Sequence, residues 1–145
     1  MKICLGSRMQ HTYHIHPIGW IHKSKNSITI DIDPLYADAL LGLEAFSHIL
    51  VLYWFHEHDD AENRRTLQVH PRRNPKNPLT GVFATHAPVR PNLIAVSTCK
   101  IESIDGTTIR IDDIDARNGS PVVDIKCYIP GKRSFAGLKM PEWVK

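Results

Sequence analysis

The stretch 81–92, GVFATHAPVRPN, combines residue types that are suited to holding an anion. Pro88 and Pro91 have fixed backbone φ angles and no backbone donor, and each keeps the preceding residue out of helical geometry. Residues 87–91 are therefore predicted to form a stiff, extended loop with unpaired carbonyls. Arg90, held in such a loop, could bind a carboxylate or a phosphate through paired hydrogen bonds. An alternative of equal weight is a rigid connection between strands, with Arg90 in a surface salt bridge.

Basic residues are concentrated in the segment 64–76, which is polar and rich in proline. Five cations in such a segment could contact RNA phosphates and give a salt-dependent affinity. The alternative is a solvated surface. The RNA-binding residues predicted here are Arg64, Arg65, Arg72, Arg73 and Lys76.

Nine histidines raise the question of a metal site. His14 and His16 would share one face of a strand, and His56 and His58 lie two residues apart. No cysteine or carboxylate completes a recognisable zinc pattern around them, so no metal site is predicted. Two cysteines, Cys99 and Cys127, lie on apolar strand faces, so we interpret them as core residues.

The composition is typical of one globular domain: 145 residues, of which 42% are hydrophobic and 23% charged. A formal net charge of +3 permits a polyanionic partner without requiring one. Three scattered cysteines favour reduced thiols and a cytoplasmic location. The longest apolar run, 49–55, is too short to span a membrane. Residues 1–11 are interpreted as a lead-in to a single domain at 12–145.

The elements that must position the polar residues are predicted to be short strands. Clean alternation over 28–32 predicts a half-buried strand, and 12–23 reads as an edge or bulged strand. Residues 46–55 are apolar on both faces, which is typical of a central strand covered on both sides. A short strand near 66–70 and a β-rich stretch at 93–104 follow.

Two further strands and one helix complete the prediction. The segments 107–111 and 122–129 both alternate between apolar and polar residues, as strands do. Asp33 and Pro34 themselves begin a short amphipathic helix that ends near Gly42. In the last strand, one face is predicted to consist of Val123, Ile125, Cys127 and Ile129.

Six or more strands without a βαβ rhythm favour a mainly β fold. The predicted architecture is a small antiparallel β-barrel with one or two short helices. No GxGxxG motif follows a strand, which argues against a Rossmann-type cofactor site.

Three blocks of sequence, in the same order, resemble the TsaA-like family of TrmO-type tRNA methyltransferases. GVFATHAPVRPNLIAVS at 81–97 resembles the family form GVFATRSPxRPNPIGLS. LEAFSHILVLYWFHE at 43–57 resembles GLEGFSHLWVLFxFH, and GSPVVDIKCYIP at 119–130 resembles DGTPVLDIKPYIP. Together with IGWIHK at 18–23, these blocks cover most of residues 16–130, so the chain is identified as a member of the family.

The resemblance implies a small β-barrel with S-adenosylmethionine (SAM) as its cofactor. It also implies a homodimer with the cofactor site near the subunit boundary. The reaction would be methylation of the N6 nitrogen of threonylcarbamoyl-adenosine in tRNA, or of a related adenosine-containing substrate. A non-catalytic SAM- or RNA-binding module is the alternative, and a metal-binding regulatory protein is a third and weaker one.

Cofactor-binding residues follow from the resemblance, position by position. The sequence departs from the family form at His86, where the family has arginine, at Leu93, where it has proline, and at Asn118, where it has aspartate. Methyl transfer from a sulfonium requires alignment and removal of a proton from the acceptor. His56, His86 and Glu57 could accept that proton, and the residues alone assign the catalytic role to none of them. The implied cofactor-binding residues are His56, Glu57, Phe83, Ala84, Thr85, His86, Arg90, Asn92, Val96, Asn118, Gly119, Ser120 and Pro121.

Overall fold

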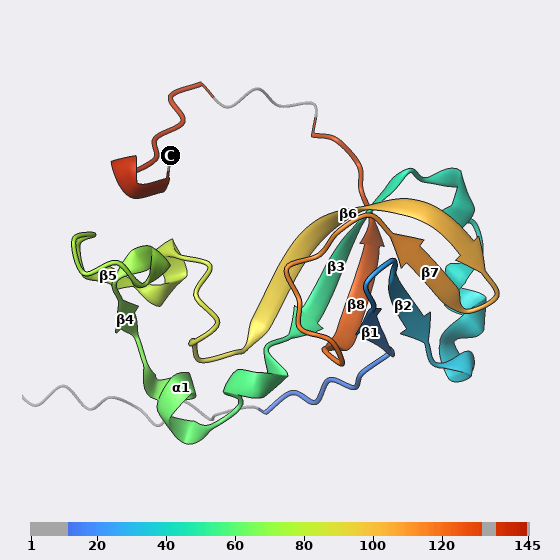
Figure 1. The fold of residues 1–145 in the computed structure, drawn as a ribbon, viewed down its shortest axis with the longest axis horizontal. Coiled ribbons are helices and arrows are strands. Elements are labelled where there is room, and N and C mark those ends of the chain that lie inside the picture. Colours follow the sequence, from blue (N-terminus) through green and yellow to red (C-terminus); the bar gives the residue numbers. More distant parts are fainter. Residues whose placement is uncertain (1–11, 132–135, 145) are drawn as a thin grey trace, which may run out of the picture.

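A closed antiparallel β-barrel is the main body of the molecule (Figure 1). The computed structural model describes residues 12–131 and 136–144, so the lead-in predicted at 1–11 lies outside the described residues. The strands follow one another around the barrel in the order β1-β2-β7-β6-β3-β8. This confirms the predicted mainly β fold. Their bounds are β1 Gly19–Lys23, β2 Ile28–Ile32, β3 His48–Trp54, β6 Ile94–Asp105, β7 Thr108–Ile111 and β8 Pro121–Cys127.

The remaining elements are short. A second sheet has two strands, β4 Gln68–Val69 and β5 Thr80–Gly81. No helix among residues 12–131 and 136–144 is long and apolar enough to cross a membrane. The one α-helix in the described part of the chain is α1 Ala61–Arg65, and the 3₁₀ helices there are η1 Pro34–Leu40, η2 Leu43–Ala45, η3 His56–His58, η4 Pro71–Arg73, η5 Val82–Ala84 and η6 Glu142–Val144.

The helix predicted after Asp33 is present as the 3₁₀ helix η1. The Asp33 carboxylate accepts a hydrogen bond from the Leu35 amide at 2.9 Å, which is the expected N-cap. Gly42 follows the helix with a φ of 84°, a left-handed conformation that glycine adopts without a steric cost. The start and the end of this element were therefore predicted correctly, and its helix type was not.

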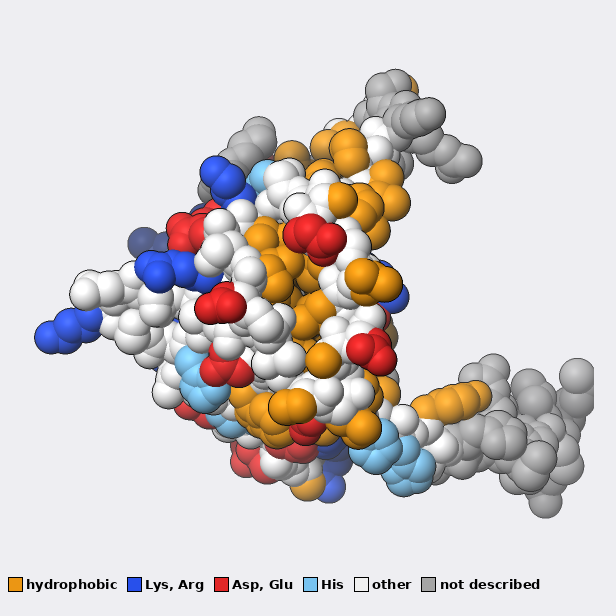
Figure 2. Space-filling model, turned by 90° about the vertical axis from the view of Figure 1, so that its right-hand side faces the viewer, with side chains coloured by type: hydrophobic (Ala, Val, Ile, Leu, Met, Phe, Trp, Pro, Cys, Tyr) orange, Lys and Arg blue, Asp and Glu red, His pale blue; other side chains and the backbone are white. Residues whose placement is uncertain are grey.

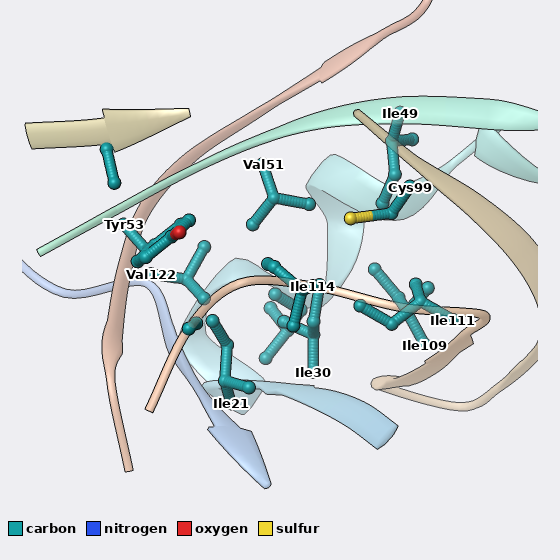
Figure 3. Close-up of a cluster of buried hydrophobic side chains, with 13 residues drawn as sticks. Ile21, Ile30, Ile49, Val51, Tyr53, Cys99, Ile109, Ile111, Ile114 and Val122 are labelled. Carbon is teal, nitrogen blue, oxygen red and sulfur yellow. The ribbon is translucent and has the colours of Figure 1, made fainter. Parts of the chain in front are cut away.

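Isoleucines that face inwards from neighbouring strands are the commonest residues of the barrel core (Figure 3). Ile30 on β2 stands opposite Ile21 on β1 and opposite Ile109 on β7, and all three are fully buried. On the other side, Ile49 on β3 stands opposite Cys99 on β6. Burial raises the pKa of the Cys99 thiol to about 12, so it remains protonated and acts as a small core residue.

Two predicted strands differ from the structure. The strand expected over 12–23 is confined to β1, because Pro17 lacks an amide donor for a ladder. β1 also has neighbours on both sides, β2 and β8, so it is not an edge strand. In β3, Ile49, Val51 and Tyr53 are buried and the residues between them are half-buried. β3 is thus central but not covered on both sides, since one face of a barrel strand points outwards.

The predicted face of β8 that contains Ile125 is wrong at Val122 and Val123. On β3, Leu52 pairs with Asp124 of β8, but the following residue, Tyr53, pairs with Val122. Val123 is therefore skipped, and the register shifts by one residue there. This shift is a β-bulge, and it reverses the alternation of the strand. Val122 is therefore fully buried in the core, on the same face as Ile125 rather than opposite to it.

Residues 55–92 connect β3 to β6 and project from one end of the barrel; we call this segment the arm (Figure 1). The opposite side of the molecule carries η1 and β7. Figure 2 looks at that side and shows apolar side chains over its centre, with acidic side chains around them. Leu35 and Leu41, in and just after η1, are among the most exposed apolar residues. The arm and this face with its apolar centre thus lie on different sides of the molecule.

Candidate functional site

Two adjoining clefts lie where the arm meets the barrel. The larger has a volume of about 610 Å³ and is lined mainly by arm residues; we call it the arm cleft. The smaller, of about 410 Å³, reaches the end of β1 and the loop before β8; we call it the barrel cleft. The two share lining residues and so lie side by side, and we call the two together the groove. Residues that line both are His58, Arg73, His86, Pro88 and Asp115.

The floor of the barrel cleft is a loop, residues 112–120, that Lys23 holds in place. The Lys23 ammonium donates to the carbonyls of Ile114 at 2.7 Å and Ala116 at 3.1 Å. The Lys23 amide donates to the side-chain oxygen of Asn118 at 2.9 Å. One residue at the end of β1 thus fixes three points of a loop that is distant in sequence.

Tyr53 fastens the same loop from inside the barrel. Its hydroxyl donates to the carbonyl of Asp115 at 2.8 Å. Burial raises the pKa of the Tyr53 hydroxyl, so the group keeps the proton that this hydrogen bond requires. The Asp115 carboxylate, on the exposed side of the loop, is left to line both clefts.

Replacing Lys23 by methionine is expected to loosen this floor. Hydrogen bonds from a charged donor contribute about 2 kcal/mol each, so we expect the free energy of unfolding to fall by about 2 kcal/mol or more. The affinity of the barrel cleft for its ligand should also fall, because the loop that forms its floor is less well fixed. Urea denaturation measures the first effect and calorimetric titration the second. Lys100→Met, on an exposed position of β6, is the matched control. Equal stability of the two variants would contradict the role given to Lys23.

Charges of both signs line the barrel cleft. Glu57 and Asp115 supply carboxylates, and Arg73 and Arg117 supply guanidinium groups. The Arg117 Nε lies 3.5 Å from a carboxylate oxygen of Glu57, and both side chains are largely exposed. An exposed pair of this kind contributes little to stability and can open when a ligand arrives. The cleft is therefore suited to a ligand that carries both an ammonium and a carboxylate.

The loop that carries His86 is braced by Arg90. The Arg90 guanidinium donates to the carbonyls of Ala87 at 3.2 Å and Thr85 at 3.4 Å. The Thr85 hydroxyl donates to the Val82 carbonyl and accepts from the Ala87 amide. The carbonyl of Ala87 was expected to be unpaired, and that prediction is wrong. Arg90 is also not in a surface salt bridge: it fixes the conformation of its own loop, which presents His86 to both clefts.

A second group of contacts fixes the base of the arm. The Asp59 carboxylate accepts from Trp54 Nε1 at 2.9 Å and from Arg64 Nε at 2.7 Å. Arg64 stacks over the Trp54 ring at 5.4 Å and donates to the Pro91 carbonyl at 3.2 Å. The hydrogen bond from Arg64 lowers the pKa of Asp59. Both ends of the arm are therefore tied together, and the Pro91 carbonyl, also expected to be unpaired, has a donor.

The structure brings about half of the predicted cofactor-binding residues to the groove. His56, Glu57 and Ser120 line the barrel cleft, Ala84 and Thr85 line the arm cleft, and His86 lines both. The others lie elsewhere. Gly119 has a φ of 81° and donates to the Ile21 carbonyl at 2.7 Å, so it shapes the loop rather than the lining. The residues that line neither cleft are Phe83, Arg90, Asn92, Val96, Asn118, Gly119 and Pro121.

The predicted RNA-binding residues also separate into groups. Arg72 and Arg73 line the arm cleft, and both have a left-handed backbone conformation, with φ of 57° and 54°. Arg64 is held in the contacts at the base of the arm. Arg65 lines a separate shallow hollow beside Phe83, and Lys76 is exposed outside both clefts. A role in RNA binding stays a prediction for all five.

Sequence reasoning missed several residues that line the groove. His58 carried a signal, since it lies two residues from His56 and on the same short helix. Lys23, Asp115 and Trp143 carried none, because chain segments far apart in sequence bring them to the clefts. Among residues 12–131 and 136–144, no group of three or more histidine, cysteine or acidic side chains is arranged to hold a metal ion.

Comparison with protein families gives one match. Residues 9–132 match the model of the family described as the tRNA-methyltransferase O N-terminal domain. A relative from Pyrococcus horikoshii, named a probable S-adenosyl-L-methionine-binding protein, is 47% identical over 116 residues. That alignment covers 80% of this chain and 82% of the relative. The match therefore extends over about four fifths of each protein.

Longer proteins share the same region. A human tRNA (adenine(37)-N6)-methyltransferase is 42% identical over 91 residues, which are 63% of this chain and 20% of the human protein. A crystal structure of TrmO from Pseudomonas aeruginosa has a TM-score of 0.69 and 27% identity, and the match covers 92% of this chain. Another TrmO crystal structure has a TM-score of 0.68 and 30% identity, over 90% of this chain. This chain spans only 62% and 64% of those two solved chains.

Proposed function

Because the chain belongs to the TrmO N-terminal domain family, we propose that it is a SAM-dependent methyltransferase. Its substrate is the N6 nitrogen of threonylcarbamoyl-adenosine in tRNA, or a related adenosine-containing substrate. The observation that carries this proposal is the pair of adjoining clefts between arm and barrel. Residues matched to the family's cofactor site from three segments meet there, beside two arginines of the arm.

The barrel cleft fits the chemistry of SAM. SAM carries an ammonium and a carboxylate on one end and a methyl group on a sulfonium, which it supplies to the acceptor. Glu57 and Asp115 are available to the cationic groups, and Arg73 and Arg117 to the carboxylate. Ser120 is nearly fully buried at the cleft wall, so the chain there is held rigidly before any ligand binds.

The chain contributes alignment and a proton acceptor to the reaction. The braced loop from Thr85 to Arg90 sets the position of His86. Of the three groups that could accept the proton, His86 alone lines both clefts, whereas His56 and Glu57 line only the barrel cleft. We therefore place the methyl acceptor between the two clefts, with His86 beside it.

The same proposal includes a cytoplasmic homodimer of one barrel domain, residues 12–145. Phe83 and Val96 match family cofactor residues, yet they line neither cleft of their own chain and are 82% and 59% exposed. A second copy that covers these side chains would bring them to its own cofactor site. The three cysteines, which are scattered along the sequence, favour reduced thiols and a reducing compartment.

Two measurements test the proposal. Calorimetric titration of the purified protein with SAM should give saturable binding at one site per subunit, with ATP as the control ligand. Incubation with SAM and total tRNA should then produce S-adenosylhomocysteine and methylated tRNA. Saturable binding without turnover would favour the non-catalytic SAM-binding module instead, and no SAM binding would refute both.

Replacing Arg90 by alanine is expected to weaken SAM binding about tenfold. The variant loses the donors that fix the carbonyls of Thr85 and Ala87, so part of the binding free energy is spent on ordering the loop. The barrel itself should lose less than about 1 kcal/mol of stability, because Arg90 contacts no barrel strand in these hydrogen bonds. Calorimetry and thermal unfolding measure the two effects. Wild-type SAM affinity and dimer content in this variant would show that Arg90 does not act on the site.

A further inference from the structure

The C-terminal residues of the chain form one wall of the arm cleft. Trp143 and Val144, in η6, both line that cleft together with arm residues from 69–73 and 84–89. The Arg72 guanidinium donates to the Val144 carbonyl at 2.9 Å. Residues 143 and 144 therefore lie beside the arm, and Figure 1 shows η6 next to it.

The arm cleft has the composition of a site for a nucleobase and its phosphates. Trp143 offers a flat aromatic surface that is only half-buried. Pro88 and Val89 provide an apolar wall, and His70 adds an imidazole ring. Arg73 is exposed at the same cleft. Aromatic rings combined with nearby cations are the usual means of binding unpaired nucleotides, because the ring stacks on a base and the cation contacts the backbone.

We propose that Trp143 is a stacking platform for an unpaired RNA base, and that Arg73 contacts a phosphate next to that base. This inference rests on the proposed function and assigns the RNA-binding part of the groove. The stacked base is a neighbour of the methylated one, because the methyl acceptor is placed between the two clefts and Trp143 lines only the arm cleft.

The distribution of charge indicates that the ring stacked on Trp143 is a base of RNA and not the adenine of SAM. Of the residues that line the arm cleft, Asp115 is the only acidic one, while Arg72 and Arg73 are both basic. The barrel cleft has two carboxylates and so matches the zwitterionic and sulfonium groups of SAM. A phosphate is present in RNA and absent from SAM, so the two cations of the arm cleft match RNA.

Tryptophan fluorescence tests the proposal directly. A single-stranded heptaribonucleotide with a central adenosine should quench the emission of the wild-type protein. Trp143→Ala should lose this quenching and bind the RNA about tenfold more weakly by anisotropy with a labelled oligonucleotide. Trp143→Phe should keep most of the affinity, because it keeps an aromatic ring. Trp20 lies on β1 and lines neither cleft. The emission of Trp20→Phe should therefore be quenched by the RNA as strongly as that of the wild type.

Three outcomes would overturn the inference. Quenching by S-adenosylhomocysteine that disappears in Trp143→Ala would assign the stacked ring to the cofactor. Unchanged RNA affinity in Trp143→Ala would remove Trp143 from the site. An equal loss of affinity in Trp143→Ala and Trp143→Phe would show that Trp143 does not act as a stacking platform. Thermal unfolding of each variant shows whether the barrel is intact.

Methyl transfer to tRNA separates this inference from the proposed function. If the wild type methylates tRNA and Trp143→Ala has the same KM for tRNA, the inference fails and the function stands. If the wild type transfers no methyl group but Trp143-dependent RNA binding is observed, the methyltransferase function fails and the stacking platform stands.

Discussion

Alanine at position 19 is expected to lower the free energy of unfolding by about 3 kcal/mol, at the upper end of the usual cost of overpacking. Gly19 lies in β1 with β2 on one side and β8 on the other. A Cβ atom there would collide with the Asp31 carbonyl oxygen and lie 3.0 Å from Ile32 Cα. Both are backbone atoms of β2, so they can move only if the pairing of β1 with β2 is distorted.

Gly81→Ala is the matched control for this variant. The nearest atom to a Cβ at position 81 is the Leu67 carbonyl oxygen at 4.0 Å, and the backbone there is extended. This substitution should change the unfolding free energy by less than about 1 kcal/mol. Urea denaturation measures the unfolding free energy of both variants, and the dependence of that free energy on urea concentration is compared between them. If Gly19→Ala were as stable as Gly81→Ala, the close approach of β1 and β2 would not be as described.

Charge reversal at Arg73 is expected to reduce the affinity for tRNA by more than tenfold. Arg73 is exposed, lines both clefts, and lies on the arm with Arg72. Loss of one phosphate contact should also reduce the slope of log K against log salt by about 1. Filter binding of tRNA to Arg73→Glu between low and moderate salt would measure both quantities, and SAM titration would show whether the cofactor site is also affected.

Lys100→Glu controls for net charge. It alters the formal charge of the protein by the same amount, but Lys100 is an exposed residue of β6 that lines neither cleft. Long-range attraction to tRNA falls equally in both variants. An equal loss of affinity in the two would mean that Arg73 acts only through the total charge, and the assignment of the arm cleft to RNA would be wrong.

Local patterns in the sequence were sufficient to predict most strands. The alternation of Ile28, Ile30 and Ile32 depends only on neighbouring residues, and β2 has the predicted bounds. The inward face of β8 could not be predicted, because its bulge at Val123 exists only through pairing with β3. The same alternation fits either face until the partner strand selects one.

The residues of the candidate site also fall into two groups: those that a local motif identified and those that only the fold brings to the clefts. His86 and Ser120 were identified because their short motifs resemble a family, and the structure places both at the groove. Lys23 was missed because its role is to bind carbonyls some ninety positions further along the chain. Trp143 was missed for the same reason, since its cleft is formed with arm residues. Sequence reasoning recovers motifs, whereas contacts between distant segments require the fold.

The shortest junction of the barrel is the one between β1 and β8, which pair at only two positions. Backbone hydrogen bonds from Ile18 to Val122 and from Ile21 to Ser120 extend it. Because this junction joins the first strand to the last, its loop-closure entropy is the largest in the barrel, and folding should be slow. During synthesis the barrel cannot close until β8 has left the ribosome. Until then β1 presents an unpaired edge, which is a site for aggregation between nascent chains.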